Sequence, residues 1–103
     1  MKKSDFHIRY KNGFNKVSGY IELITDKQNN KIMIGFHNVP GMWWVATHIE
    51  SGLLLCHAKT RKECLEKVKN TEFLERLSNS IERSDIKEYI EQKQRYLKTG
   101  SID

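Results

Sequence analysis

The sequence contains little proline, glycine or cysteine, and it has no long apolar run. Proline occurs once, glycine six times and cysteine twice in 103 residues, and 38% of the residues are hydrophobic. This composition argues against wholesale disorder. No segment approaches the ~20 apolar residues of a membrane-spanning helix. The first ten residues, MKKSDFHIRY, contain no apolar segment of the kind a secretory signal requires, so we expect a cytoplasmic protein.

Catalytic and metal-binding patterns are also missing. The two cysteines, Cys56 and Cys64, are too few for a disulfide framework. Cys56 and His57 are adjacent and point to opposite faces of a strand, so they cannot easily share one zinc ion. The sequence has no Gly-rich phosphate loop, nucleophile elbow or spaced carboxylate pair. We therefore expect no enzyme, metal or cofactor; an unrecognised enzyme that uses Cys64 or a histidine is the least favoured alternative.

Basic residues outnumber acidic ones. Lys and Arg total 18 against 13 Asp and Glu, which gives a net charge of +5. Such a charge suits a nucleic-acid ligand, and it equally suits a protein that only needs to stay dissolved. Isoleucine, lysine and asparagine are common while alanine occurs only at Ala46 and Ala58. This bias is typical of AT-rich genomes and suggests a low-GC bacterium or one of its phages or plasmids.

Alternating apolar residues predict strands in the first part of the chain. Asn12-Gly13 favours a type I′ hairpin turn, which would set Ile8 opposite Val17. Residues 31–37 read as a third strand, and 39–41 as a turn with Pro40 and Gly41 in type II positions. A last hairpin would turn at 50–52. The sequence therefore predicts a five-stranded antiparallel meander.

Helical periodicity follows the strands. Thr60 and Glu63 form a capping box that predicts a helix start, a restart is expected at 70–71, and Ser84 is expected to cap a last helix. The fold class is α+β, with two or three C-terminal helices packed on one face of the sheet. We expect one domain over residues 1–99, with the sheet at about 6–59, the helices at about 61–98, and a flexible tail at 100–103.

The segment 43–60, WWVATHIESGLLLCHAKT, has two faces of different character. If Ser51-Gly52 form the turn, Thr47 pairs with Cys56 and Val45 with Ala58. The core face would then hold Trp43, Val45, Thr47, Ile49, Leu54, Cys56 and Ala58. The opposite face would carry Trp44, Ala46, His48, Leu55 and His57, and it would be covered by the helices or a second subunit, or else serve for binding.

Two kinds of binding surface are predicted from these patterns. Cations beside aromatic residues can hold phosphates while the rings stack on bases, and backbone N–H groups at a helix start can receive a phosphate. The predicted nucleic-acid-binding residues are Arg9, Lys11, Lys16, Tyr20, Lys59, Arg61 and Lys62. The predicted protein-binding residues are Trp44, His48, Leu55 and His57, and the same face could form a homodimer.

The segment 43–68, a hairpin followed by T-R-K-E-C, resembles two families. One is the amino-terminal DNA-binding domain of phage integrases, and the other is the HicB-type antitoxin. The likeness rests mainly on the capping box. The antitoxins have a proline-glycine motif between strand and helix, whereas Pro40-Gly41 comes before the strands in this sequence. No family is therefore assigned. The leading hypothesis is a non-enzymatic nucleic-acid-binding module from a phage or mobile element. The alternative is a protein-binding regulator or inhibitor of a host nuclease or defence enzyme, in the manner of anti-CRISPR proteins.

Overall fold

The chain folds as a five-stranded antiparallel sheet followed by three helices. The computed structural model describes residues 2–10 and 13–100. The strands are β1 (Lys2–Tyr10), β2 (Gly13–Thr25), β3 (Lys31–Asn38), β4 (Trp44–His48) and β5 (Leu53–Ala58). The helices are α1 (Arg61–Lys69), α2 (Thr71–Ile81) and α3 (Ser84–Thr99). Neighbours in the sheet are neighbours in the sequence, so the predicted meander and the α+β fold class are confirmed.

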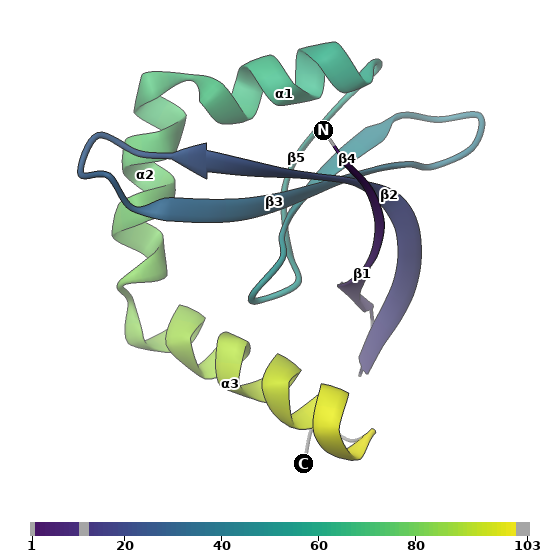
Figure 1. Ribbon diagram of the computed structural model, residues 1–103, viewed down its shortest axis with the longest axis vertical. Coiled ribbons are helices and arrows are strands. Elements are labelled where there is room, and N and C mark those ends of the chain that lie inside the picture. The colour runs from purple at the N-terminus through teal and green to yellow at the C-terminus, as the bar shows by residue number, and fades with distance from the viewer. Residues whose placement is uncertain (1, 11–12, 101–103) are drawn as a thin grey trace.

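The helices form an arc around the sheet. In Figure 1, α1 crosses the top of the molecule, α2 descends on the left and α3 runs along the bottom. Gly100, with φ +77°, ends α3, and its N–H donates to the Tyr96 carbonyl. Residues 101–103 of the predicted tail lie outside the described residues. None of the helices in the described ranges is long and apolar enough to cross a membrane.

The register of the first hairpin differs from the prediction by two residues. Ile8 lies opposite Asn15, and Val17 lies opposite Phe6. Gly13 belongs to β2 and pairs with Tyr10, so the predicted Asn12-Gly13 turn is wrong at Gly13; residues 11–12 lie outside the described residues. Because the side chains of a strand alternate with a period of two, this shift leaves each residue on its expected face.

The register of the last hairpin differs by one residue at its centre, and this shift moves the β4 side chains to the other face relative to Cys56 and Ala58 of β5. Ala46 pairs with Cys56, where the sequence predicted Thr47. The physical reason is the turn, in which His48 pairs with Leu53 and the Gly52 N–H donates to the His48 carbonyl at 2.7 Å. This turn is longer than Ser51-Gly52 alone, and a bulge follows it in the ladder. The predicted core face is therefore wrong for β4, whereas Cys56 and Ala58 of β5 lie on the core side as predicted. The alternative that the helices cover the face with Trp44, Ala46 and His48 is the one that the structure shows.

The main core lies between the sheet and the first two helices. Isoleucine and phenylalanine side chains of β2 and β3 pack there, together with alanines of β4 and β5, against Cys64, Val68 and Leu77. Trp44 and Cys56 of the same face pack against this cluster. The helices thus cover the face predicted for binding, while Trp43 and Leu54, predicted as core residues, are 39% and 64% exposed.

The opposite face of the sheet is partly covered by the chain itself. A side-chain carbon added to Gly35 would lie 2.6 Å from the Phe6 ring, so β1 curls over β3 at this point. The same curl brings Phe6 within 6.0 Å of the His37 ring and buries both residues. Val45 and Thr47 are buried on this face as well.

Local signals account for most element boundaries. The Thr60 side chain accepts the Glu63 N–H at the start of α1, which confirms the predicted cap. Asn70 caps α2 in the same way through the Phe73 N–H, as the expected restart. Ser84 does not cap α3: it is the first helical residue, and the cap residue before it makes no side-chain cap hydrogen bond.

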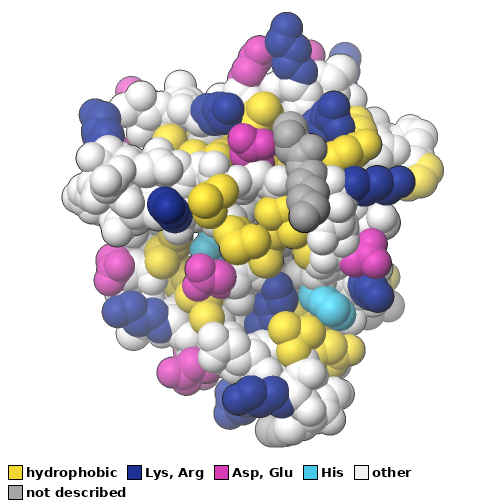
Figure 2. All heavy atoms as spheres, viewed as in Figure 1, with side chains coloured by type: hydrophobic (Ala, Val, Ile, Leu, Met, Phe, Trp, Pro, Cys, Tyr) yellow, Lys and Arg dark blue, Asp and Glu magenta, His cyan; other side chains and the backbone are white. Residues whose placement is uncertain are grey.

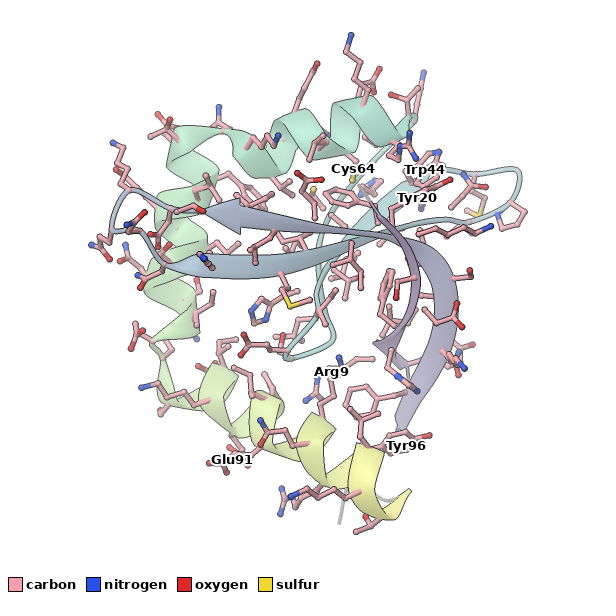
Figure 3. The ribbon with its side chains drawn as sticks, viewed as in Figure 1. Arg9, Tyr20, Trp44, Cys64, Glu91 and Tyr96 are labelled. Atoms are coloured by element: carbon pink, nitrogen blue, oxygen red, sulfur yellow. The ribbon has the colours of Figure 1, made fainter. Side chains whose placement is uncertain are left out.

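Two basic side chains tie α3 to the sheet. The Arg9 guanidinium donates to the carbonyls of Ser51 at 2.9 Å and Tyr89 at 2.7 Å. The Lys93 ammonium donates to the Ile49 carbonyl and is only 5% exposed. Burial lowers the pKa of both basic groups. Figure 3 shows Arg9 in the space between the first hairpin and α3.

Candidate nucleic-acid interface

Three predicted binding residues meet where α1 begins. The Arg61 guanidinium lies 4.3 Å from the centroid of the Tyr20 ring and 5.8 Å from that of the Trp44 ring. The two rings are 6.2 Å apart and inclined by 37°. We call Tyr20, Trp44 and Arg61 the aromatic–cation cluster. Figure 3 shows Tyr20 and Trp44 side by side at the upper right, next to the start of α1.

Neighbouring strands place the members of this cluster. Tyr20 of β2 lies opposite Phe36 of β3, and Trp44 opens β4 opposite Ala58, the last residue of β5. Arg61 is the first residue of α1, three positions after Ala58. The chain therefore leaves the sheet beside Trp44 and enters the helix with Arg61 above the rings. Both rings are half-buried and Arg61 is exposed.

Further lysines surround the cluster. Lys3 lies directly opposite Tyr20 across the first hairpin, on the same face of the sheet. Lys59 and Lys62 flank Arg61 in the sequence, and all three lysines are exposed. Within residues 2–10 and 13–100, these cations make no ion pair at 4.0 Å or less. Their charges are therefore available to an external anion.

The first turn of α1 adds to the positive potential. Helix N-termini carry unpaired N–H groups and a positive dipole end, which disfavours cations there and favours anions. Arg61 and Lys62 nevertheless occupy the first two helical positions, with Glu63 the acidic residue of that turn. The Thr60 side chain accepts the Glu63 N–H, so this donor is satisfied without a ligand.

Two other predicted nucleic-acid-binding residues, Arg9 and Lys16, make contacts elsewhere in the molecule. Arg9 is half-buried and uses its guanidinium to hold α3, where it also lies 4.5 Å from the centroid of the Tyr89 ring. Lys16 is exposed and its ammonium is 3.6 Å from an Asp5 carboxylate oxygen. Lys11 lies outside the described residues. The structure thus assigns Arg9 to packing.

The four predicted protein-binding residues do not share a surface. Trp44 and Leu55 pack against the main core, and His48 is 3% exposed. His57 is exposed on the opposite face, and its ring centroid is 4.6 Å from that of Trp43. The four residues were predicted to share one exposed face. Because the register of the last hairpin differs by one residue from the predicted register, Trp44 and His48 instead lie on the face that the helices cover.

His48 borders an apolar pocket of about 350 Å³ between β5, α2 and α3. Its Nδ1 lies 2.7 Å from Ser51 Oγ, which also accepts the Leu53 N–H at 3.2 Å. Burial lowers the pKa of His48, so the ring is neutral near pH 7. The side chains of His48 and Ser51 form their hydrogen bonds within the turn that sets the strand register, so their role is structural.

Lys3, Trp43 and Lys93 were not among the predicted site residues, although the structure gives each of them a place in the surfaces or contacts described above. Lys3 continues the alternation of β1 beyond its predicted start, and this period of two was the available signal. Lys93 lies four residues after Tyr89 on the same side of α3, but a lysine in an apolar stripe gives no sign that it will be buried.

No group of three or more His, Cys, Asp or Glu side chains in the described ranges is placed to hold a metal ion. The comparisons with known proteins add no assignment: no family model matches the chain, and neither the curated proteins nor the solved structures gave a significant match.

Proposed function

We propose that this chain is a small, non-enzymatic, cytoplasmic binding module of a phage or mobile element, and that it binds nucleic acid at the aromatic–cation cluster. The observation that supports the proposal is the position of the Arg61 guanidinium over Tyr20, beside Trp44. Rings of this kind stack on unpaired bases, and a neighbouring guanidinium or ammonium contacts the phosphates. The half-exposed aromatic rings therefore favour a single strand over a duplex.

The surrounding charges support the same ligand. Lys3, Lys59 and Lys62 border the cluster, and the α1 dipole adds positive potential to it. On the face shown in Figure 2, basic and acidic side chains are interspersed around the rim, so the net positive charge is not gathered there. The local grouping around Arg61, and not the total charge of the chain, is what supports the proposal.

The alternative is a protein-binding regulator or inhibitor of a nucleic-acid-processing enzyme. The observation that favours it is the exposed aromatic pair Trp43 and His57, next to Met42, which is 61% exposed. Tryptophan is enriched among the residues that dominate protein interfaces. This surface lies beside the one predicted around Trp44, but on the other face of the sheet.

The first experiment is a fluorescence anisotropy titration with labelled single-stranded and duplex oligonucleotides over a range of salt concentrations. We expect preferential binding to the single strand. Each phosphate contact adds about 0.7 to the slope of log affinity against log salt concentration. The double variant Arg61→Glu, Lys62→Glu should lower this slope by at least about 1.4 and weaken binding at every salt concentration.

A matched control separates local from total charge. Arg95→Glu, Lys98→Glu makes the same charge change at exposed positions of α3. Figure 3 shows Tyr96, which lies between these two residues in the sequence, at the opposite end of the molecule from Trp44. The control should retain most of the affinity. Equal losses in both double variants would refute a local site.

Tyr20→Val tests the stacking component, since valine keeps the strand propensity and removes the ring. Loss of one stacked base costs about 1–3 kcal/mol, or about 5- to 150-fold in affinity. Light scattering should precede the titrations, to show whether the chain is monomeric. A folded protein that binds no oligonucleotide at low salt would overturn the proposal, and Trp43→Ala in a partner-capture assay would then test the alternative.

A further inference from the structure

The two cysteines, which the proposed function does not use, lie side by side. Cys56 belongs to β5 and Cys64 to the first turns of α1, and their sulfur atoms are 3.9 Å apart. A disulfide bond requires about 2.0 Å between the sulfurs, so they must approach by about 1.9 Å. A change of rotamer in one or both cysteine side chains moves the sulfur atoms by distances of this size.

The two thiols differ in accessibility. Cys64 is completely buried, and its sulfur also lies 3.9 Å from the Trp44 carbonyl oxygen. Cys56 is partly exposed, and it borders a surface depression that also includes Lys67 and Arg76. A dissolved reagent can therefore reach the Cys56 sulfur. It cannot reach the buried Cys64 sulfur directly, but Cys64 can react with a group attached to Cys56.

The surroundings also make Cys56 the more nucleophilic thiol. The hydrogen bond between the two thiols lowers the pKa of Cys56, and the positive charge of Lys67 acts in the same direction. The Lys67 ammonium is held beside β5 by a 2.8 Å hydrogen bond to the His57 carbonyl. The thiolate is the attacking species in thiol–disulfide exchange. The same hydrogen bond and burial raise the pKa of Cys64, so Cys64 is not the thiol that attacks first.

We propose that Cys56 and Cys64 form a dithiol–disulfide modification site, in which a low-molecular-weight disulfide oxidises the pair to an intramolecular bond. The Cys56 thiolate attacks one sulfur of the reagent RSSR, forming a mixed disulfide and releasing RS⁻. Cys64 then gives up its proton and attacks the Cys56 sulfur of the mixed disulfide, releasing a second RS⁻. The pair loses two electrons and two protons in total, and RSSR is reduced to two RSH.

This inference is independent of nucleic-acid binding, and its test measures no affinity. The reduced, folded protein is incubated with mixtures of oxidised and reduced glutathione, quenched with acid, alkylated after denaturation and weighed by mass spectrometry. We expect a species that takes up no alkyl group, carries no glutathione and is two hydrogen atoms lighter than the reduced chain. Circular dichroism of the reacted sample checks that the fold persists.

Single variants separate the two roles. Cys64→Ser should stop at a stable mixed disulfide on Cys56, because the resolving thiol is gone. Cys56→Ser should leave Cys64 unreactive in the folded state, with a rate at least about tenfold below that of Cys56 in the Cys64→Ser variant, since a fully buried group reacts only after local opening.

The wild-type result is decisive. A mixed disulfide that accumulates on the wild-type chain without resolving would overturn the proposal, and so would a folded wild-type chain in which both thiols stay reduced in oxidised glutathione. Equal reaction rates of the two single variants would contradict the assignment of Cys56 as the attacking thiol. Serine substitutions can destabilise a core, but the wild-type measurement needs no variant.

Discussion

A substitution of His37 tests the packing on the face of the sheet where β1 curls over β3. Its ring is 8% exposed and stands edge-on to Phe6, and its Nδ1 has no hydrogen-bond partner within the part of the chain that the structure describes. Burial lowers the pKa of His37, and no charged group contributes to that shift. We predict that His37→Leu leaves the stability at pH 7 unchanged to within about 0.5 kcal/mol or increases it, and that the variant is clearly more stable than the wild type in mild acid.

The magnitude follows from three opposing contributions. An unpaired buried polar atom costs about 1–3 kcal/mol, and the substitution removes that cost. The lost aromatic contact with Phe6 is worth about 0.5–1.5 kcal/mol. Leucine fills a similar volume, so little strain is expected. The net change at pH 7 therefore lies between a loss of about 0.5 kcal/mol and a gain of about 2.5 kcal/mol for the variant.

The pH dependence is the more specific part of this prediction. A histidine whose pKa is lowered by folding stays neutral in the native state while the unfolded chain takes up a proton. Stability is therefore full above about pH 6.5 and falls on acidification, by up to about 1.4 kcal/mol per pH unit for each such group. His7, His37 and His48 all belong to this class, so the limiting slope in the wild type is about 4.1 kcal/mol per pH unit.

Urea unfolding followed by tryptophan fluorescence at about pH 7, 6 and 5 measures these free energies. His37→Leu should reduce the slope below pH 6.5 by roughly one third, because it removes one of three such histidines. A variant that is destabilised by more than about 1 kcal/mol at pH 7, with an unchanged slope, would refute the placement of His37.

Two further substitutions test how the sheet and α3 are held. Arg9→Met keeps the apolar stem but removes the hydrogen bonds to the Ser51 and Tyr89 carbonyls, so we expect a loss of about 2–4 kcal/mol in urea unfolding and faster hydrogen exchange along α3. Normal exchange protection in α3 would show that Arg9 is dispensable. Gly19→Ala should cost more than about 3 kcal/mol, because the added carbon would lie 2.1 Å from the Phe36 carbonyl oxygen of the neighbouring strand. Gly41→Ala is its control: Gly41 has φ +75° but open space around it, so a loss near 1 kcal/mol is expected.

Much of the architecture could be predicted because local patterns determine it. Period-two alternation defined the strands, and side-chain caps at Thr60 and Asn70 marked the first two helix starts. The turn at Pro40-Gly41 also formed as expected, with the Met42 N–H donating to the Val39 carbonyl. Each of these signals acts within a few residues, so the sequence alone contains it.

Register and burial could not be predicted because they depend on distant contacts. The last hairpin turns over four residues, stabilised by Gly52 and by the His48–Ser51 pair, and a bulge follows it. A shift of one residue in this turn decided which tryptophan faces the helices. Likewise, the curl of β1 over Gly35 gave the second face its own buried residues, which the alternation pattern does not reveal.

The candidate site illustrates the same division. The sequence contained Tyr20, Trp44 and Arg61 as separate signals, two assigned to nucleic acid and one to protein. They meet because a correctly predicted helix start follows a strand whose register was predicted incorrectly. If Trp44 had faced away from the helices, Arg61 would have had only Tyr20 beneath it. The aromatic–cation cluster is therefore a product of the observed register.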